Sequence, residues 1–434
     1  MGTAPLFTNL PATEEREPVP PATPPVAARV VEPVRNQVEM VWRDLDSWVA
    51  ADHPARAIWG LLEGLDLSGF YAQVRAVDGR AGRPASDPQV LLALWLYATV
   101  ESIGSARHLA ELCERDDVYR WLRGGVPVNY HMLADFRTAH QAALNELLTE
   151  IITTLLAQEL VSLKRVAQDG MRVRASAGAA SFRREQTLER VRQEAQEQVE
   201  RLAAEVAEPG GQASKRARVA QERAERVARA LAQLPAVRAL KETVADQAKA
   251  RVSTTDPDAR VMKMGDGGFR PAFNVELATD TSSQVVVGVM VTNQGTDTEE
   301  APPMAAQVEA RSGQRPEELL VDGGFAPKQT VTALEPQAIT VYAPVQKPKD
   351  PARNPYEPLK GDAPAVAAWR QRMGTEEAKA IYKERAATAE CVNAQCRSRY
   401  GMQQFRVRGV HKVACVVLLT VITHNLLRWL ALTA

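Results

Sequence analysis

The sequence predicts an α/β fold that is preceded by an all-α N-terminal domain and interrupted by a helical hairpin. Residues 36–160 carry apolar side chains at helical spacing. Residues 161–434 alternate between strand and helix patterns, as α/β domains do. A highly charged helical block at about residues 182–251 separates the first of these strands from the second. We expect an antiparallel hairpin there, with apolar positions such as Val199 and Val219 facing each other.

The composition limits the classes of protein to consider. The 434 residues are 45% hydrophobic and carry a formal net charge of zero, so any DNA contact would need local basic patches. Four cysteines without a Cys-x-x-Cys pair and six scattered histidines offer no zinc spacing. No signal peptide is apparent, so we expect a cytoplasmic protein with reduced thiols. The apolar run Val413–Ile422 is too short to span a bilayer and predicts a core helix rather than a membrane partner.

The N-terminal part divides into a tail and a helical domain. Residues 1–35 are rich in Pro, Ala and Glu and should be disordered. Ser86-Asp87-Pro88 predicts the start of a helix that is apolar nearly all round, and Asn129 predicts the cap of a later one. Short capped helices are compatible with a helix-turn-helix DNA reader, and also with a plain bundle that supports the rest of the chain.

Two aspartates lie at positions that suit metal ligands. Asp169 lies in an alternating strand pattern among basic residues, as expected of a site that holds metal and phosphate, although an Asp before a Gly is also a common turn. Asp322 ends an apolar strand before a glycine-rich turn, and parallel strands carry ligand groups at their carboxyl ends. Asp280 lies in a hairpin turn, so we interpret it as structural.

A third group of candidates lies on the segment Ile381–Tyr400, which predicts one regular helix. At 100° per residue, Tyr382, Arg385, Glu390 and Arg397 fall within an arc of about 140°. A carboxylate flanked by guanidinium groups and a phenol suits a divalent metal and the phosphates on which it acts. The alternative is the solvated face of an amphipathic helix.

These residues also carry a family resemblance. Their spacing resembles the Tyr-Arg-Glu-Lys signature of bacterial insertion-sequence transposases, although that family more commonly has its Glu one residue closer to the Arg, and Arg397 stands where it has Lys. The strings around Asp169 and Asp322, the helical segment 86–122 and the closing segment 401–430 are similar to parts of the same family.

The resemblance implies an RNase H-like catalytic domain and a DDE transposase. Asp169, Asp322 and Glu390 would then be the catalytic metal ligands and would hold two Mg²⁺ ions, with Mn²⁺ as a substitute, since all three are hard oxygen donors. Tyr382, Arg385 and Arg397 are the candidate DNA-binding residues, and they would hold phosphates or a displaced base. The implied partners are the terminal inverted repeats and target DNA, with a homodimer assembled on DNA at the nucleoid.

Alternatives remain open from the residues. One is a metal-dependent nuclease or recombinase of the same fold that moves no element. Another is a non-catalytic DNA-binding scaffold with a coiled arm. The basic residues of the hairpin fit a DNA or dimer contact, but also a solvated arm. His424 and Asn425 are expected to anchor the closing helix through hydrogen bonds rather than to catalyse.

Overall fold

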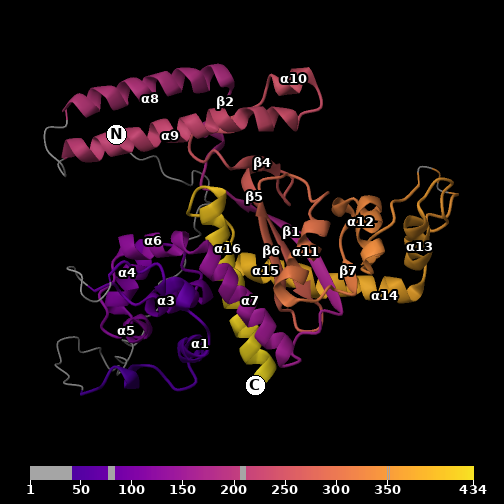
Figure 1. The fold of residues 1–434 in the computed structure, drawn as a ribbon, viewed down its shortest axis with the longest axis horizontal. Helices are drawn as coiled ribbons and strands as arrows, with labels where there is room; N and C mark the ends of the chain where they lie inside the picture. Colours follow the sequence, from indigo (N-terminus) through magenta and orange to yellow (C-terminus); the bar gives the residue numbers. More distant parts are fainter. Residues whose placement is uncertain (1–41, 77–83, 206–211, 349, 351) are drawn as a thin grey trace, which may run out of the picture. The chain divides into compact units, whose positions relative to one another are not determined.

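The computed structural model describes residues 42–76, 84–205, 212–348, 350 and 352–434. The predicted tail, residues 1–35, lies outside the described residues. The α/β class predicted from the sequence is confirmed, because a mixed sheet is covered by helices (Figure 1). The described helices before the sheet are α1 (Pro54–Glu63), α2 (Ser68–Tyr71), α3 (Pro88–Val100), α4 (Ala106–Arg115), α5 (Asp117–Arg123), α6 (Tyr130–Ala139) and α7 (Gln141–Ala157).

The N-terminal helices begin where the capping residues predict. The Asp87 carboxylate accepts a hydrogen bond from the Gln89 backbone N–H at the start of α3. The Asn129 side chain does the same for the first turn of α6. Helix α3 is buried along nearly its whole length, which explains why its sequence is apolar all round.

The sheet is built around β1, which carries Asp169. The strand β1 pairs antiparallel with β5 and parallel with β7, which in turn pairs parallel with β8. On its other side β5 pairs antiparallel with β4 and with β6. The bounds are β1 (Arg165–Arg174), β4 (Arg260–Lys263), β5 (Phe269–Asp280), β6 (Val286–Thr292), β7 (Glu318–Leu320) and β8 (Thr340–Tyr342).

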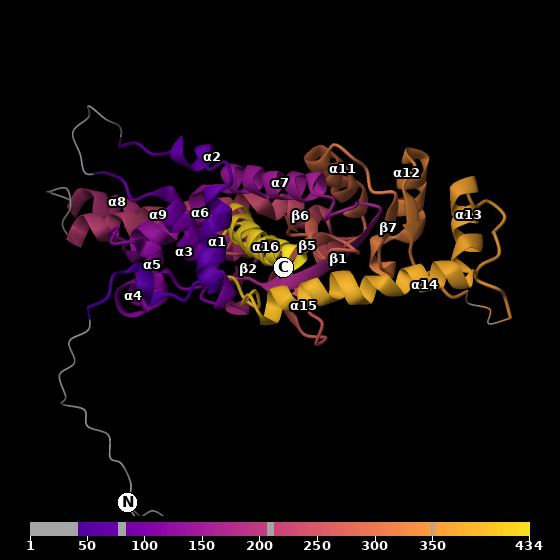
Figure 2. The same ribbon diagram turned by 90° about the horizontal axis from the view of Figure 1, so that it is seen from below.

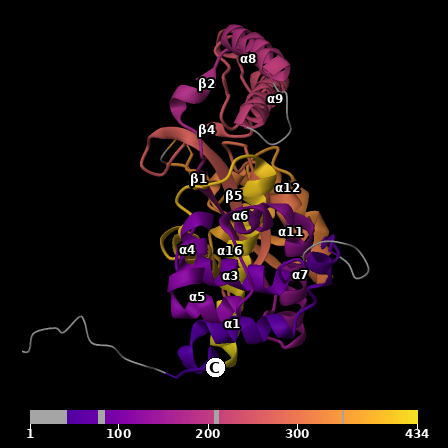
Figure 3. The ribbon, with the colours of Figure 1, turned by 90° about the vertical axis from the view of Figure 1, so that its left-hand side faces the viewer.

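The charged block between β1 and β5 forms two long helices, α8 (Glu185–Glu205) and α9 (Gln212–Ala239), which lie side by side (Figure 3). Short strands β2 (Phe182–Arg183) and β3 (Val252–Ser253) pair at its base, next to α10 (Val244–Gln247). The prediction that Val219 of α9 faces α8 is wrong, because Val219 is 58% exposed. Ala220 is buried instead, because the buried face of α9 continues through Val227 and Leu234, at spacings of seven.

The remaining helices cover the sheet. Helices α14 and α15 follow one another along it in Figure 2. Helix α16 packs on β6 and also on α3, α6 and α7, so the N-terminal helices and the sheet share one hydrophobic core. The bounds are α11 (Ala301–Ser312), α12 (Pro327–Leu334), α13 (Pro364–Met373), α14 (Glu376–Arg385), α15 (Cys391–Ser398) and α16 (Val410–Thr433).

Helix α16 confirms the prediction of a core helix. By length and composition it is the one helix among the described residues that could cross a membrane, but 67% of its apolar window is buried inside the protein. Its polar residues bond to the sheet, as expected. The Asn425 side chain bonds to both backbone groups of Val286 (2.9 and 2.8 Å), and the His424 ring bonds to the Gln284 carbonyl oxygen (2.8 Å).

Candidate active site

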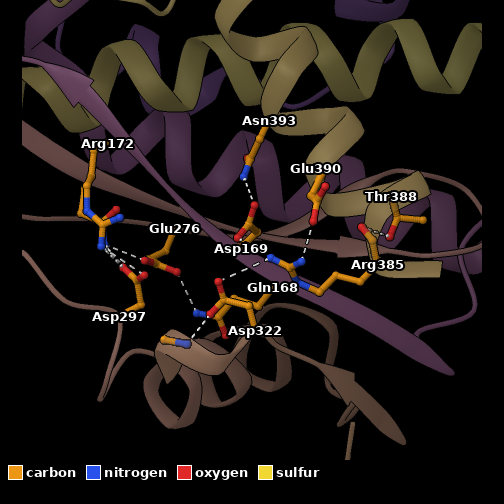
Figure 4. A network of polar contacts seen from close by, with 12 residues as sticks. Gln168, Asp169, Arg172, Glu276, Asp297, Asp322, Arg385, Thr388, Glu390 and Asn393 are labelled. Carbon is orange, nitrogen blue, oxygen red and sulfur yellow. Dashed lines mark hydrogen bonds and ion pairs between the residues drawn. The ribbon is translucent and has the colours of Figure 1, made fainter. Parts of the chain in front are cut away.

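Three acidic side chains that the sequence singles out surround one guanidinium group. Arg385 donates to Asp169 Oδ1 (2.8 Å) and to Glu390 Oε1 (2.6 Å), and its Nη2 lies 3.7 Å from Asp322 Oδ2 (Figure 4). Arg385 is only 9% exposed. Residues that are far apart in the sequence therefore meet at one point, beside the central strand of the sheet.

Each carboxylate is positioned by a different element. Asp169 lies in the middle of β1, opposite Leu277 of β5. Asp322 follows β7, and its Oδ1 accepts a hydrogen bond from Gly324 N (2.7 Å), which starts a short 3₁₀ turn. Because β1 and β7 are parallel neighbours, the end of β7 lies close to the centre of β1. Glu390 comes from the helical segment that crosses the sheet.

That helical segment is not the regular helix that the sequence predicts. Residues Ala386–Glu390 form a π-helical turn between α14 and α15. A π turn closes i→i+5 hydrogen bonds and so holds one residue more than an α turn. Its extra residue brings Glu390 back toward Arg385, five positions earlier, and the two side chains form an ion pair. The extra residue matches the one-residue difference from the spacing that the resembling family more commonly has.

The site is electrostatically coupled. Burial raises the pKa of Asp169, and Asp322 adds to this, while Arg385 acts in the opposite direction. Burial disfavours the charged form of Arg385, but Asp169, Tyr382 and the other two acids outweigh it and raise its pKa. Burial also raises the pKa of Tyr382, which is half-buried beside the same charges. Tyr382 therefore belongs to the cluster as a neutral phenol.

Arg397 does not join this cluster. Its Nη2 donates to the Arg172 carbonyl oxygen (3.4 Å), and within the described part of the chain it forms no ion pair with the three acids.

Asp280 does not belong to the cluster around Arg385 either. Its buried carboxylate accepts from the backbone of Leu163 and from Ser283, which confirms a structural role in the hairpin turn.

Asn393 is a site residue that the sequence analysis missed. Its Nδ2 donates to Asp169 Oδ2 (2.9 Å), so both oxygens of this carboxylate are held. It lies on α15, three residues after Glu390, on the side of the helix that faces the sheet. The i, i+3 spacing from Glu390 was the signal that could have identified it.

A second buried polar group adjoins the first. Asn274 donates to Glu276 Oε1 and to Asp297 Oδ1 (both 2.7 Å), and Arg172 reaches Asp297 (3.3 Å). Burial, with Asp297 close by, raises the pKa of Glu276 to about 9. A Cβ at Gly170 would lie 2.3 Å from Glu276 Oε1, so the residue after Asp169 has to be glycine for this packing.

The three carboxylates fit a divalent cation chemically, because hard oxygen donors already converge on one positive charge. Among the described residues, however, no three His, Cys, Asp or Glu side chains approach closely enough to hold a metal ion as they stand. The guanidinium of Arg385 stands between the acids and keeps them apart (Figure 4).

Comparisons with known proteins match two parts of the chain. A family model described as "Transposase DDE domain" matches residues 362–430, which include Glu390 and most of α16. A second, "Transposase domain (DUF772)", matches residues 43–139, the first helices. Asp169 and Asp322 lie outside both ranges. No curated protein and no solved structure matches the chain.

Proposed function

We propose that the chain is an insertion-sequence DDE transposase, which cuts DNA at the ends of a mobile element and joins the freed 3′-hydroxyl to target DNA; the matches to two transposase family models support this. The observation that carries this proposal is the meeting of Asp169, Asp322 and Glu390 around Arg385. The reaction is two in-line displacements at phosphorus. Water attacks first and releases a 3′-hydroxyl, which then attacks a target phosphodiester and releases the target's own 3′-oxygen.

We assign the catalytic domain to the RNase H-like fold. Support comes from the order β6-β5-β1-β7-β8, in which the first three strands are antiparallel and the last two run parallel to β1. The domain would span residues 161–434, with the hairpin at about 182–251 inserted after β1. Residues 36–160 would form the DNA-binding domain that recognises the element's ends, where the terminal inverted repeats are the partner.

Asp169, Asp322 and Glu390 would hold Mg²⁺, two ions in all. When bound, the metal activates the attacking oxygen and stabilises the leaving oxygen. Asn393 fixes the orientation of Asp169 through their hydrogen bond. Arg385 and Tyr382 lie at the same point and are placed to contact a phosphate group. Arg397 would contact DNA further along, near Arg172.

The test is a cleavage and joining assay on DNA that carries the element's own ends. Asp322→Asn and Glu390→Gln should each abolish cleavage, because an amide is a poor ligand for Mg²⁺, while both variants still bind the DNA. Glu384→Gln is the matched control, since Glu384 lies on the same helical segment but pairs with Arg165, outside the cluster. It should cut at close to the wild-type rate.

Three results would change the proposal. Cleavage without joining would indicate a nuclease that moves no element. Specific DNA binding without either reaction would indicate a scaffold. Full activity of Asp322→Asn would remove Asp322 from the metal site.

A further inference from the structure

One feature that the proposed chemistry does not use is a cleft of about 830 Å³ between the N-terminal helices, the segment 400–406 and α16. Its walls come from α3, α4 and α6, from the segment 400–406 and from α16. Within the described residues that line it, the only charged side chains are the three arginines Arg107, Arg137 and Arg406. A cleft lined by three positive charges and no carboxylate is built for an anion.

Arg137 is the most informative of the three. Its side chain is buried, with 8% of the residue exposed, and its Cζ lies 4.5 Å from the centre of the Trp95 ring. Nη1 donates to the Gly104 carbonyl oxygen (2.6 Å), and Nε has no hydrogen-bond partner among the described residues. Burial and the nearby Arg406 lower its pKa to about 10, so it remains charged at neutral pH.

A buried guanidinium of this kind is costly unless it is paired. The neighbouring Arg406 adds like-charge repulsion, and each adds to the attraction of the cleft for an anion. The amino end of α4 also faces the cleft, with Ser105 as its capping residue. Helix N-termini favour negative charge.

The lining suits a nucleotide better than a bare inorganic anion. One exposed aromatic ring, that of Tyr130, stands beside the arginines, and Arg107 lies over it with its Cζ 5.0 Å from the centroid. Aromatic faces stack on bases, while arginine forks bind phosphate oxygens bidentately. Charge and apolar surface together favour a nucleic-acid strand.

The cleft is connected to the active site through β1. Gln404, in its wall, pairs with Arg174 at the end of β1. Asp169 is five residues back along the same strand, which is about 16 Å at 3.3 Å per residue. A DNA strand whose phosphate lies in the cleft could therefore place a phosphate a few nucleotides away beside Asp169.

We propose that this arginine-lined cleft binds a backbone phosphate of the DNA strand that enters the active site, with Arg137 as the deepest contact. The inference rests on the proposed function, because it takes DNA as the substrate. Arg137 and Arg406 are DNA-binding residues on this view, and α3, α6 and the segment 400–406 together form a guide for the strand.

The experiment measures affinity for duplex DNA of arbitrary sequence over a range of salt concentrations, with the full chain and without metal. Each lost phosphate contact lowers the slope of log affinity against log salt by about one. Arg406→Gln and Arg137→Gln should each lower the slope by about that amount and weaken binding at every salt concentration. Arg137→Lys should retain part of the affinity, because it keeps the charge but loses the fork.

Arg311→Gln is the matched control. Arg311 is as buried as Arg137 (7% exposed), but its guanidinium donates to the Asn145 backbone and side chain and to Thr149, away from the cleft. It should leave the slope unchanged. Arg406 is exposed, so Arg406→Gln keeps the test valid if Arg137→Gln fails to fold.

A second arm adds inorganic pyrophosphate and follows thermal unfolding. It should raise the Tm of the wild type and not that of Arg137→Gln or Arg406→Gln. If pyrophosphate binds through these arginines but their loss leaves the DNA slope unchanged, the cleft takes a free phosphate ligand and its assignment to DNA is overturned. Unchanged slopes with no pyrophosphate effect overturn the site altogether. If the wild type fails to cleave DNA in the active-site assay but the arginine variants lower the salt slope as predicted, only the proposed chemistry is overturned and the cleft remains a DNA-binding site.

Discussion

Arg385 supplies the positive charge that pairs with the three acids. It donates to Asp169 and Glu390 and lies within ion-pair distance of Asp322, yet it carries no metal-ligating atom. In the metal-free protein it offsets the repulsion between carboxylates that lie close to one another. Its removal should therefore affect chemistry more than metal binding.

We expect Arg385→Ala to lower the rate of DNA cleavage by roughly 10²-fold, the usual size when a preorganised contact to developing charge is lost. Mg²⁺ binding should persist, because every oxygen ligand remains. Isothermal titration with Mg²⁺ beside a cleavage time course separates the two effects. Lys383→Ala, an exposed basic residue on the same helix, is the control. A wild-type cleavage rate for Arg385→Ala would make this arginine merely structural.

Some of the residues at the candidate site can be predicted from the sequence and others cannot, because some lie in local motifs and others depend on how strands pair. Asp169, Asp322 and Glu390 each stand in a local motif, so a single sequence suffices to propose them as candidates. Asn274 and Glu276 alternate with Phe273 and Val275 in β5, a pattern that usually indicates a solvated face. Only the pairing of β5 with β1 reveals that these polar residues are buried beside Gly170, and register is not visible in one strand.

The π-helical turn Ala386–Glu390 is the element that sets the geometry of the site. A helical wheel at 100° per residue separates Arg385 from Glu390 by about 140°, too far for the ion pair that the structure contains. Secondary-structure patterns do not indicate a π turn, because its residues differ from those of an α-helix only in hydrogen bonding. The bounds of α11 and the start of α3, in contrast, follow directly from Pro and capping residues.

Deletion of Ala387 should convert the π turn into a regular helical turn and keep Glu390 facing Arg385, now four positions apart. We expect cleavage within about tenfold of the wild type, because i, i+4 residues share a helix face. Deletion of Lys383, which precedes the π turn, should instead rotate Tyr382 and the earlier part of α14 by about 100° relative to Arg385 and Glu390 and abolish cleavage. Cleavage assays and circular dichroism of both deletions provide the test. Loss of activity in the Ala387 deletion alone would show that the π turn itself is required.

At the scale of the whole molecule, helix α16 joins the N-terminal helices to the sheet. Thr423 bonds to the Leu96 carbonyl oxygen of α3 (3.5 Å), and Asn425 bonds to β6. A helical N-terminal part and a following α/β part are readable from periodicity as a prediction. Their shared core is not, because it depends on a helix more than 250 residues away along the chain.

His424, in the same helix, should make folding sensitive to acid. Burial lowers its pKa from the usual 6.5 to about 4, so the folded protein binds the proton less readily than the unfolded chain. The contribution of neutral His424 to the free energy of unfolding is fully present above about pH 6.5 and is lost as the pH falls toward 4. The total loss is of order 3 kcal/mol. Denaturant unfolding at pH 7 and pH 4.5 should show a smaller difference for His424→Asn than for the wild type. The exposed His411, replaced by Asn, should behave like the wild type.

The position of Arg385 among the acids has a consequence for metal binding, because it should make the affinity for Mg²⁺ depend on whether DNA is bound. A phosphate that attracts this guanidinium would free Asp169, Asp322 and Glu390 to hold Mg²⁺, so DNA and metal should bind with positive cooperativity. Linkage makes the effect reciprocal: whatever factor DNA adds to the affinity for metal, metal adds to the affinity for DNA. In titrations of the wild-type protein, the Mg²⁺ dissociation constant should fall several-fold when duplex DNA is present. Arg385→Ala should abolish this dependence, and an identical dependence in that variant would mean that the coupling arises elsewhere.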